Sequence, residues 1–151
     1  MLLLLLACTG SSGDSGAPDD GVARGALSFR FPLEDASLFS LRIGVDHDPA
    51  VYGEDWNCLD YAGRAFPHCY DEHDGSDYIL EGGFDTMDSG SAVIVAAADG
   101  EVIATEDGHY DRCHADLTTG DVTCDGHEMI ANSVIIEHAT GHRTMYWHLS
   151  L

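Results

Sequence analysis

The sequence predicts a mainly β domain built from short antiparallel strands, and three observations support that fold class. Runs of β-branched and apolar residues recur at 92–98, 101–105 and 133–138. Glycine-containing turns separate such runs, and Asp99-Gly100 fits a two-residue hairpin turn between the first two. No stretch of a dozen residues holds a convincing 3.6-residue apolar period, so we expect no long helix.

The elements follow in order once the chain turns globular at about Leu27. Residues 29–33 alternate apolar and polar side chains. The turn Ala139-Thr140-Gly141 joins the last two expected strands, whose composition is rich in β-branched and aromatic residues. We expect strands at 40–44, 92–98, 101–105, 133–138 and 143–148.

The first eight residues resemble a bacterial lipoprotein signal. Met1 and a leucine run lead into Leu5-Leu6-Ala7-Cys8, which is similar to a lipobox, where the cysteine becomes the lipidated first residue of the mature protein. The apolar run is about a third of the ~20 residues that a membrane-spanning helix needs. We therefore expect a leader at 1–8, a Gly/Ser/Asp-rich linker at 9–26 and one domain at 27–151, with a clipped ordinary signal peptide as the alternative.

The charge of the chain excludes several partners. The sequence holds six Arg, no Lys and 27 acidic residues, which gives a formal net charge of -21 at pH 7. Such a surface repels nucleic-acid phosphates and anionic lipid headgroups. We expect no nucleic-acid partner, and contact with a membrane only through an N-terminal lipid.

Four cysteines remain after Cys8, and an even number in an exported chain suggests disulfides. Three pairings are possible. We favour the two local bridges, because each would close a short polar segment whose own packing is weak. These bridges are Cys58–Cys69 and Cys113–Cys124. A cysteine-based zinc site is disfavoured because the sequence has no Cys-x-x-Cys pair.

Two histidines differ from the other seven. His73 opens the pattern His-x-Gly-x-Asp, which lets an imidazole and the Asp77 carboxylate reach one cation if the chain bends at Gly75. His148 ends a strand on which Thr144, Tyr146 and His148 share one face, so it can be presented beside a cleft. His138 we treat as structural. We assign no role to the histidines in Asp/Gly-rich loop sequence: His47, His68, His109, His114, His127 and His142.

Four patterns in order resemble the lysostaphin (LytM) family of zinc endopeptidases, over about residues 31–151. They are His-x-Gly-x-Asp at 73–77, Ala-Ala-Asp-Gly-x-Val at 97–102, Val-Ile-Ile-x-His at 134–138 and Arg-Thr-x-Tyr-x-His-Leu-Ser at 143–150. The resemblance implies an antiparallel sheet of the LytM type with long loops. It also implies His73 and Asp77 as two of three ligands of a Zn²⁺ ion, and His148 as a catalytic histidine near the scissile carbonyl.

The chain departs from the family in one part of the site. The family completes its zinc site with a His-x-His pair, and no such pair occurs in this sequence. We therefore expect a domain that is incomplete at its C-terminus, as either a fragment or a degenerate relative, and its activity as it stands is left open. His138 or His142 could supply the third ligand, although nothing in the sequence favours either.

The resemblance predicts an endopeptidase that hydrolyses peptide bonds in bacterial peptidoglycan, as a membrane-anchored lipoprotein of the cell envelope that faces the periplasm or the exterior. One alternative is a non-catalytic LytM-like module that binds the wall or regulates another hydrolase. A second is an acidic, disulfide-stapled surface lipoprotein without a site. The acidic insert at 107–127 lacks EF-hand spacing, so a solvated loop is favoured there over a calcium site.

Overall fold

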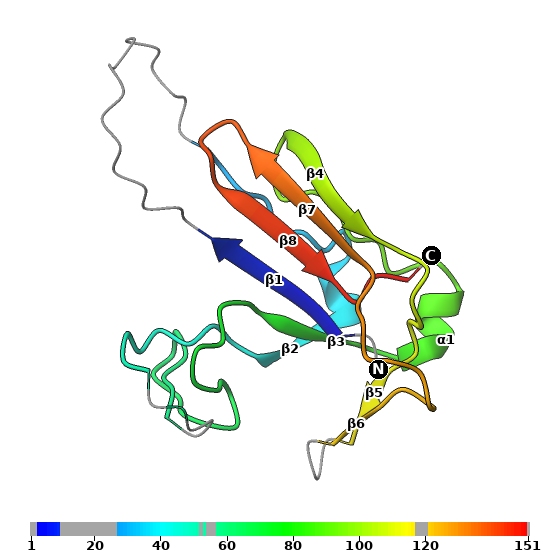
Figure 1. Cartoon of the computed structure of the whole chain (residues 1–151), viewed down its shortest axis with the longest axis horizontal. Helices are drawn as coiled ribbons and strands as arrows, with labels where there is room; N and C mark the ends of the chain where they lie inside the picture. The colour runs from blue at the N-terminus through cyan, green and yellow to red at the C-terminus, as the bar shows by residue number, and fades with distance from the viewer. Residues whose placement is uncertain (1–2, 10–26, 52, 54–56, 117–120, 151) are drawn as a thin grey trace.

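The computed structural model is mainly β, with antiparallel sheets and one short α-helix (Figure 1). The structure describes residues 3–9, 27–51, 53, 57–116 and 121–150. A six-stranded sheet has the order β2-β3-β1-β8-β7-β4, and β5 and β6 form a separate pair. The strands are β1 Leu3–Thr9, β2 Phe39–Ile43, β3 Asp77–Leu80, β4 Gly100–Glu106, β5 His114–Ala115, β6 Val122–Thr123, β7 Ser133–His138 and β8 Arg143–Trp147. The helices are the 3-10 turn η1 Ala36–Leu38 and α1 Gly83–Asp88.

The hairpin of β7 and β8 matches the sequence prediction closely. Its register pairs Ser133 with Trp147 and Ile135 with Met145. The turn closes where the His138 amide donates to the carbonyl of His142 at 2.8 Å. The β-branched residues of β7 suit a pleated, half-buried surface, and this central hairpin organises the sheet around it.

The predicted hairpin across Asp99-Gly100 is wrong. β4 pairs with β7, and residues 92–98 form an isolated bridge rather than a strand. They run antiparallel to residues 30–34, where the Val95 amide donates to the carbonyl of Pro32 at 2.8 Å. Burial of apolar side chains from both segments against the sheet outweighs the local turn signal.

The core lies on one face of the main sheet in two clusters. Leu33, Ile136 and Tyr146 form the first, which the segments at 30–34 and 93–97 cover. Leu80 and Met87 form the second, where α1 packs against β3. No helix of the described ranges is long or apolar enough to cross a membrane.

The residues assigned to a leader form β1, which lies between β3 and β8 (Figure 1). Its backbone register pairs Leu5 with Asp77 and Ala7 with Met145. The leader assignment of residues 1–8 stays a prediction. Of the linker expected at 9–26, Thr9 is the last residue of β1, and residues 10–26 lie outside the described residues. Removal of a leader would leave β3 and β8 with unpaired backbone edges that face each other.

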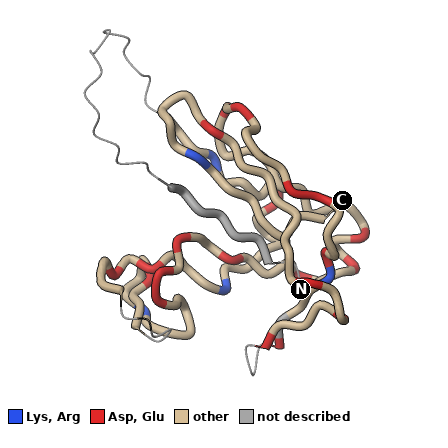
Figure 2. The backbone as a smooth tube through the Cα atoms, in the orientation of Figure 1, with Lys and Arg blue, Asp and Glu red and all other residues tan. Residues whose placement is uncertain are grey.

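Both favoured disulfides are present, Cys58–Cys69 and Cys113–Cys124. Disulfides form and persist in oxidising compartments, so they indicate a domain that works outside the cytoplasm. Figure 2 shows acidic residues spread over loops and strands with few basic residues among them, as the net charge of -21 requires.

Candidate metal centre

His73 and Asp77 face each other in the interior at the start of β3. Each residue is only 3% exposed. His73 Nε2 lies 3.3 Å from Asp77 Oδ1, and neither atom has a hydrogen-bond partner within the described part of the chain. A buried polar atom without a partner costs about 1–3 kcal/mol. A cation between the two atoms would remove that cost.

The tautomer of His73 is set by Gly44. Nδ1 of His73 lies 2.7 Å from the Gly44 carbonyl oxygen, which can only accept, so Nδ1 carries the proton. The neutral ring therefore aims the lone pair of Nε2 at the Asp77 carboxylate. Histidines that bind metals commonly donate their other ring N–H to a carbonyl in this way.

The spacing of the pair fits zinc. Two bonds of about 2.0–2.1 Å at a tetrahedral angle place their donor atoms roughly 3.3 Å apart, and Nε2 and Oδ1 are separated by 3.3 Å. An imidazole nitrogen and a carboxylate oxygen are also donors that zinc accepts. The described residues contain no group of three or more His, Cys, Asp or Glu side chains that could hold a metal ion. The site therefore fits zinc with two ligands and lacks a third.

A proton competes with a metal at this position. Burial lowers the pKa of His73, but the Asp77 carboxylate, the hydrogen bond to Gly44 and the charge of Asp74 together outweigh it, so the pKa is raised overall. Metal binding at such a ring displaces the proton and is weaker at low pH.

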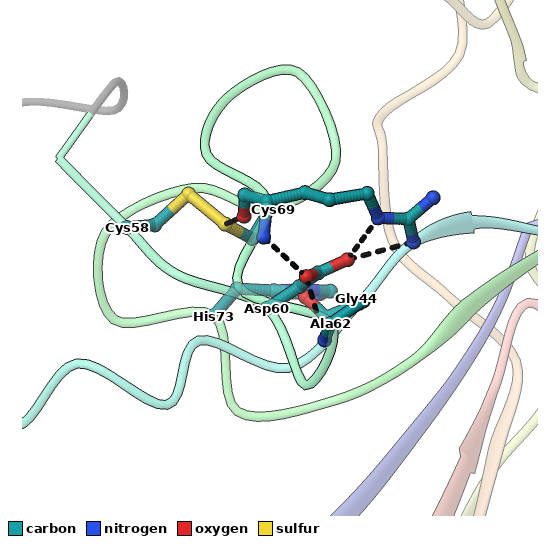
Figure 3. Close-up of polar contacts among 7 residues, drawn as sticks. Gly44, Cys58, Asp60, Ala62, Cys69 and His73 are labelled. Atoms are coloured by element: carbon teal, nitrogen blue, oxygen red, sulfur yellow. Dashed lines mark hydrogen bonds and ion pairs between the residues drawn. A yellow bond between two sulfur atoms is a disulfide. The ribbon is translucent and has the colours of Figure 1, made fainter.

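The loop at 44–73 that carries His73 is held in shape by a carboxylate and a disulfide (Figure 3). Asp60 accepts the backbone N–H of Arg64 at 2.7 Å, and its other oxygen pairs with the Arg64 guanidinium at 2.7 Å. These contacts, with the backbone hydrogen bond first, lower the pKa of Asp60. The bridge Cys58–Cys69 closes the same loop, so the chain that returns to His73 is cross-linked covalently and by hydrogen bonds.

Backbone contacts then hold this loop against the end of β2. The Gly44 amide donates to the carbonyl of His68 at 2.7 Å, and the Asp46 amide donates to the carbonyl of His73 at 2.7 Å. The Asp46 carboxylate accepts backbone N–H groups of Asp48, Leu59 and Glu72. His73 is therefore fixed through its main chain as well as its ring.

His148 leaves β8 through a left-handed turn, with φ of 57°. Asn132 fixes the following residue, because its Nδ2 donates to the Leu149 carbonyl at 3.1 Å and the Leu149 amide donates to the Asn132 carbonyl at 3.1 Å. Burial lowers the pKa of His148, and the Asp77 charge opposes that shift. The ring is therefore neutral at pH 7, in the electrostatic field of Asp77, and can accept a proton.

The predicted face of His148 is wrong. Thr144 and Tyr146 are buried on the core side, where the Ala97 amide donates to the Tyr146 hydroxyl at 2.7 Å. His148 instead lines a groove with Met145 and Trp147 on the other face. A strand alternates faces only while its dihedrals stay extended, and the left-handed turn at His148 ends that alternation.

Two other histidines are candidates for the third ligand. His138 is 2% exposed, and its ring nitrogens lie 2.9 Å from the Asp99 carbonyl and 3.0 Å from Thr144 Oγ1. Both ring nitrogens are therefore occupied, which fits a structural role. His142 is exposed and contacts the Thr140 hydroxyl. Neither belongs to a three-ligand group among the described residues.

Sequence reasoning missed the groups that position the site. Gly44 acts through a carbonyl, which every residue carries, so no sequence signal points to it. Asn132 acts through contacts between the ends of the neighbouring strands β7 and β8. The apolar pair Met129-Ile130 in a polar loop was a readable signal of an exposed apolar surface.

Comparisons of the chain with protein-family models, with curated proteins and with solved structures found no match. The class that fold and site define is therefore a mainly β, disulfide-bridged domain with a buried His–Asp pair suited to a cation.

Proposed function

We propose that this chain belongs to a zinc-dependent endopeptidase of the lysostaphin (LytM) type that hydrolyses peptide bonds in bacterial peptidoglycan. The observation that carries the proposal is the buried pair of His73 Nε2 and Asp77 Oδ1, which face each other at 3.3 Å without hydrogen-bond partners in the described chain. A protonated His73 would satisfy both atoms through this ion pair, so the argument for a cation applies to the neutral ring, whose Nε2 lone pair faces the carboxylate without a donor. The ordered motifs around 73–77 and 143–150 add support.

The residues divide the chemistry between them. His73 and Asp77 would hold the ion, and the Gly44 carbonyl keeps the His73 ring in the tautomer that can bind it. Zinc supplies Lewis acidity there, which polarises a peptide carbonyl and acidifies water. His148, whose pKa is lowered by burial, would accept a proton or orient a polar group of the substrate.

The position of β1 explains how a third ligand could reach the site. β1 fills the single strand position between β3 and β8, beside Asp77 and Met145. If residues before Cys8 are removed as a leader, this position is vacated. Another strand there could carry the family's His-x-His pair, because residues two apart on a strand face the same side.

The proposed location is the cell envelope, with the chain anchored through a lipid on Cys8. The disulfides support a compartment outside the cytoplasm. Expression in a bacterial host followed by intact-mass measurement should give a mature chain that begins at a diacylated Cys8. A mature chain that retains residues 1–7 would contradict the anchor and favour β1 as a permanent strand.

Zinc binding is the first test of the activity. Equilibrium dialysis at pH 8 should show zinc bound by the chain and lost in His73→Ala and Asp77→Ala. His142→Ala is the matched control, because His142 is exposed and lies outside the pair. Zinc-loaded protein should also release soluble fragments from purified peptidoglycan, and zinc-free protein should not. Equal zinc binding by His73→Ala and His142→Ala would overturn the assignment.

A non-catalytic wall-binding module is the second candidate. It is favoured by one observation, that the described residues supply two ligands rather than three. Such a module would sediment with peptidoglycan in both zinc-loaded and zinc-free forms and would release no fragments. Release of fragments that depends on His148 would rule it out in favour of the enzyme.

A further inference from the structure

A groove of about 480 Å³ lies beside His148, on the face of the sheet away from the core. The register of β7 with β8 places Ile135 beside Met145 and Ser133 beside Trp147, so all four share this face. Ile135, Met145 and Trp147 line it from β7 and β8, and Met129 and Ile130 line it from the segment before β7. The volume lies in the range of about 300–1,000 Å³ that ligand sites occupy. We call it the Trp147 groove.

The Trp147 groove is apolar and open to solvent. Met129 is 64% exposed, Ile130 40% and Trp147 36%. Exposed apolar side chains that line a groove together offer a surface that an apolar group of a ligand can cover. Met side chains also adapt their shape to different apolar partners.

The groove and the candidate metal centre lie on the same face of the sheet. His148 is one of its lining residues and lies in the field of Asp77. The backbone register leads to the same conclusion: positions 5 and 7 of β1 pair with Asp77 and Met145, and they are two residues apart. Asp77 and Met145 therefore lie on one face of the sheet.

One carboxylate, that of Glu106, lines the groove. Glu106 is largely exposed and lies 3.0 Å from His109 Nε2, while no Lys or Arg is among the lining residues. The chain as a whole carries a net charge of -21. An anionic ligand would be repelled, and a cationic group near Glu106 would be attracted.

We propose that the Trp147 groove selects the substrate: it binds a peptide with an apolar side chain against Met145 and Trp147, next to an amine-bearing side chain directed toward Glu106. This inference rests on the proposed endopeptidase for its catalytic meaning. It adds that specificity is set on the His148 side of the scissile bond by an apolar-then-cationic pair of side chains.

Tryptophan fluorescence provides the test, on the full chain with Trp56→Phe so that Trp147 is the sole tryptophan. Titrations in EDTA use the blocked tripeptides acetyl-Gly-Leu-Lys-amide, acetyl-Gly-Leu-Glu-amide and acetyl-Gly-Gly-Lys-amide. The Leu-Lys peptide should shift Trp147 emission and bind about tenfold more tightly than the other two. Met145→Ser should weaken binding of the Leu-Lys peptide about tenfold. Glu106→Gln should abolish the preference for the Lys peptide over the Glu peptide. Val102→Ser is the matched control, because Val102 is 55% exposed and outside the groove.

The titrations are repeated in His73→Ala, so that failure of the groove and failure of the metal site give different results. An unchanged Leu-Lys preference in that variant supports the groove even if zinc binding proves absent. Equal binding of the three peptides, or equal effects of Met145→Ser and Val102→Ser, would overturn the inference even if the protein binds zinc.

Discussion

The substitution Asp77→Asn changes the stability of the metal-free fold in opposite directions for a metal site and for a structural ion pair of His73 and Asp77. In the metal-free protein above the titration range of histidine, the Nε2 lone pair of His73 faces the Asp77 carboxylate at 3.3 Å with no donor between them. A side-chain amide keeps the shape of the carboxylate and can present an N–H to Nε2. We therefore expect the substitution to stabilise the metal-free fold, whereas loss of a structural ion pair would destabilise it.

The magnitude follows from the two atoms concerned. Each buried polar atom left without a partner costs about 1–3 kcal/mol, and the amide introduced by Asp77→Asn would satisfy Nε2 and remove the buried charge. A gain of about 1–3 kcal/mol raises Tm by roughly 2–12 °C for a chain of this length, at about 2–4 °C per kcal/mol. With zinc at 100 times its Kd the wild type gains about 2.7 kcal/mol, and the variant should gain less because a carboxylate ligand is lost.

The assay is thermal unfolding at pH 9, in EDTA and then in excess zinc. Glu101→Gln is the control, because it removes one negative charge from an exposed position of β4 and so reports the relief of general repulsion. In EDTA, Asp77→Asn should have a higher Tm than Glu101→Gln. On addition of zinc, its Tm should rise less than that of the wild type. A lower Tm than the control in EDTA, with no zinc response in the wild type, would refute a metal site at this pair.

Three further predictions concern the framework around the site. Tyr146→Phe removes the hydroxyl that accepts the buried Ala97 amide and should cost about 1–3 kcal/mol in urea unfolding; an unchanged midpoint would mean that this contact does not hold the 92–98 segment. Leu80→Ala empties a fully buried position beneath α1 and should cost about 2–5 kcal/mol, and a smaller loss would mean that the helix collapses into the space. The pKa of the Asp60 carboxyl is lowered in the fold, so its contribution to folding stability is present above about pH 3.8 and is lost as the pH falls through the lower pKa of the folded state. Asp60→Asn should therefore flatten the acid side of a plot of Tm against pH, and an unchanged acid side would contradict the role of Arg64.

The sequence predicted the parts of the fold that depend on local pattern. β7 and β8 lie where the β-branched and aromatic runs placed them, and β2 lies within one residue of its expected start. The disulfides followed from short loop lengths. The hairpin at Asp99-Gly100 failed, because the residues before it are more stable against residues 30–34, and a local turn signal contains no information on that competition.

At the candidate site too, the sequence determined some properties and the tertiary structure determined others. The sequence by itself determined which chemistry is available: a His-x-Gly-x-Asp pair, a histidine after an aromatic strand, and a strongly acidic surface. Only the tertiary structure decided that His73 Nε2 and Asp77 Oδ1 are buried 3.3 Å from each other without a further partner, and that Gly44 fixes the tautomer. It also turned His148 to the groove face through a single left-handed residue. Residue types and their spacing are local properties of a chain, whereas burial, tautomer and facing depend on contacts between segments far apart in sequence, and these exist only once the sheet has formed.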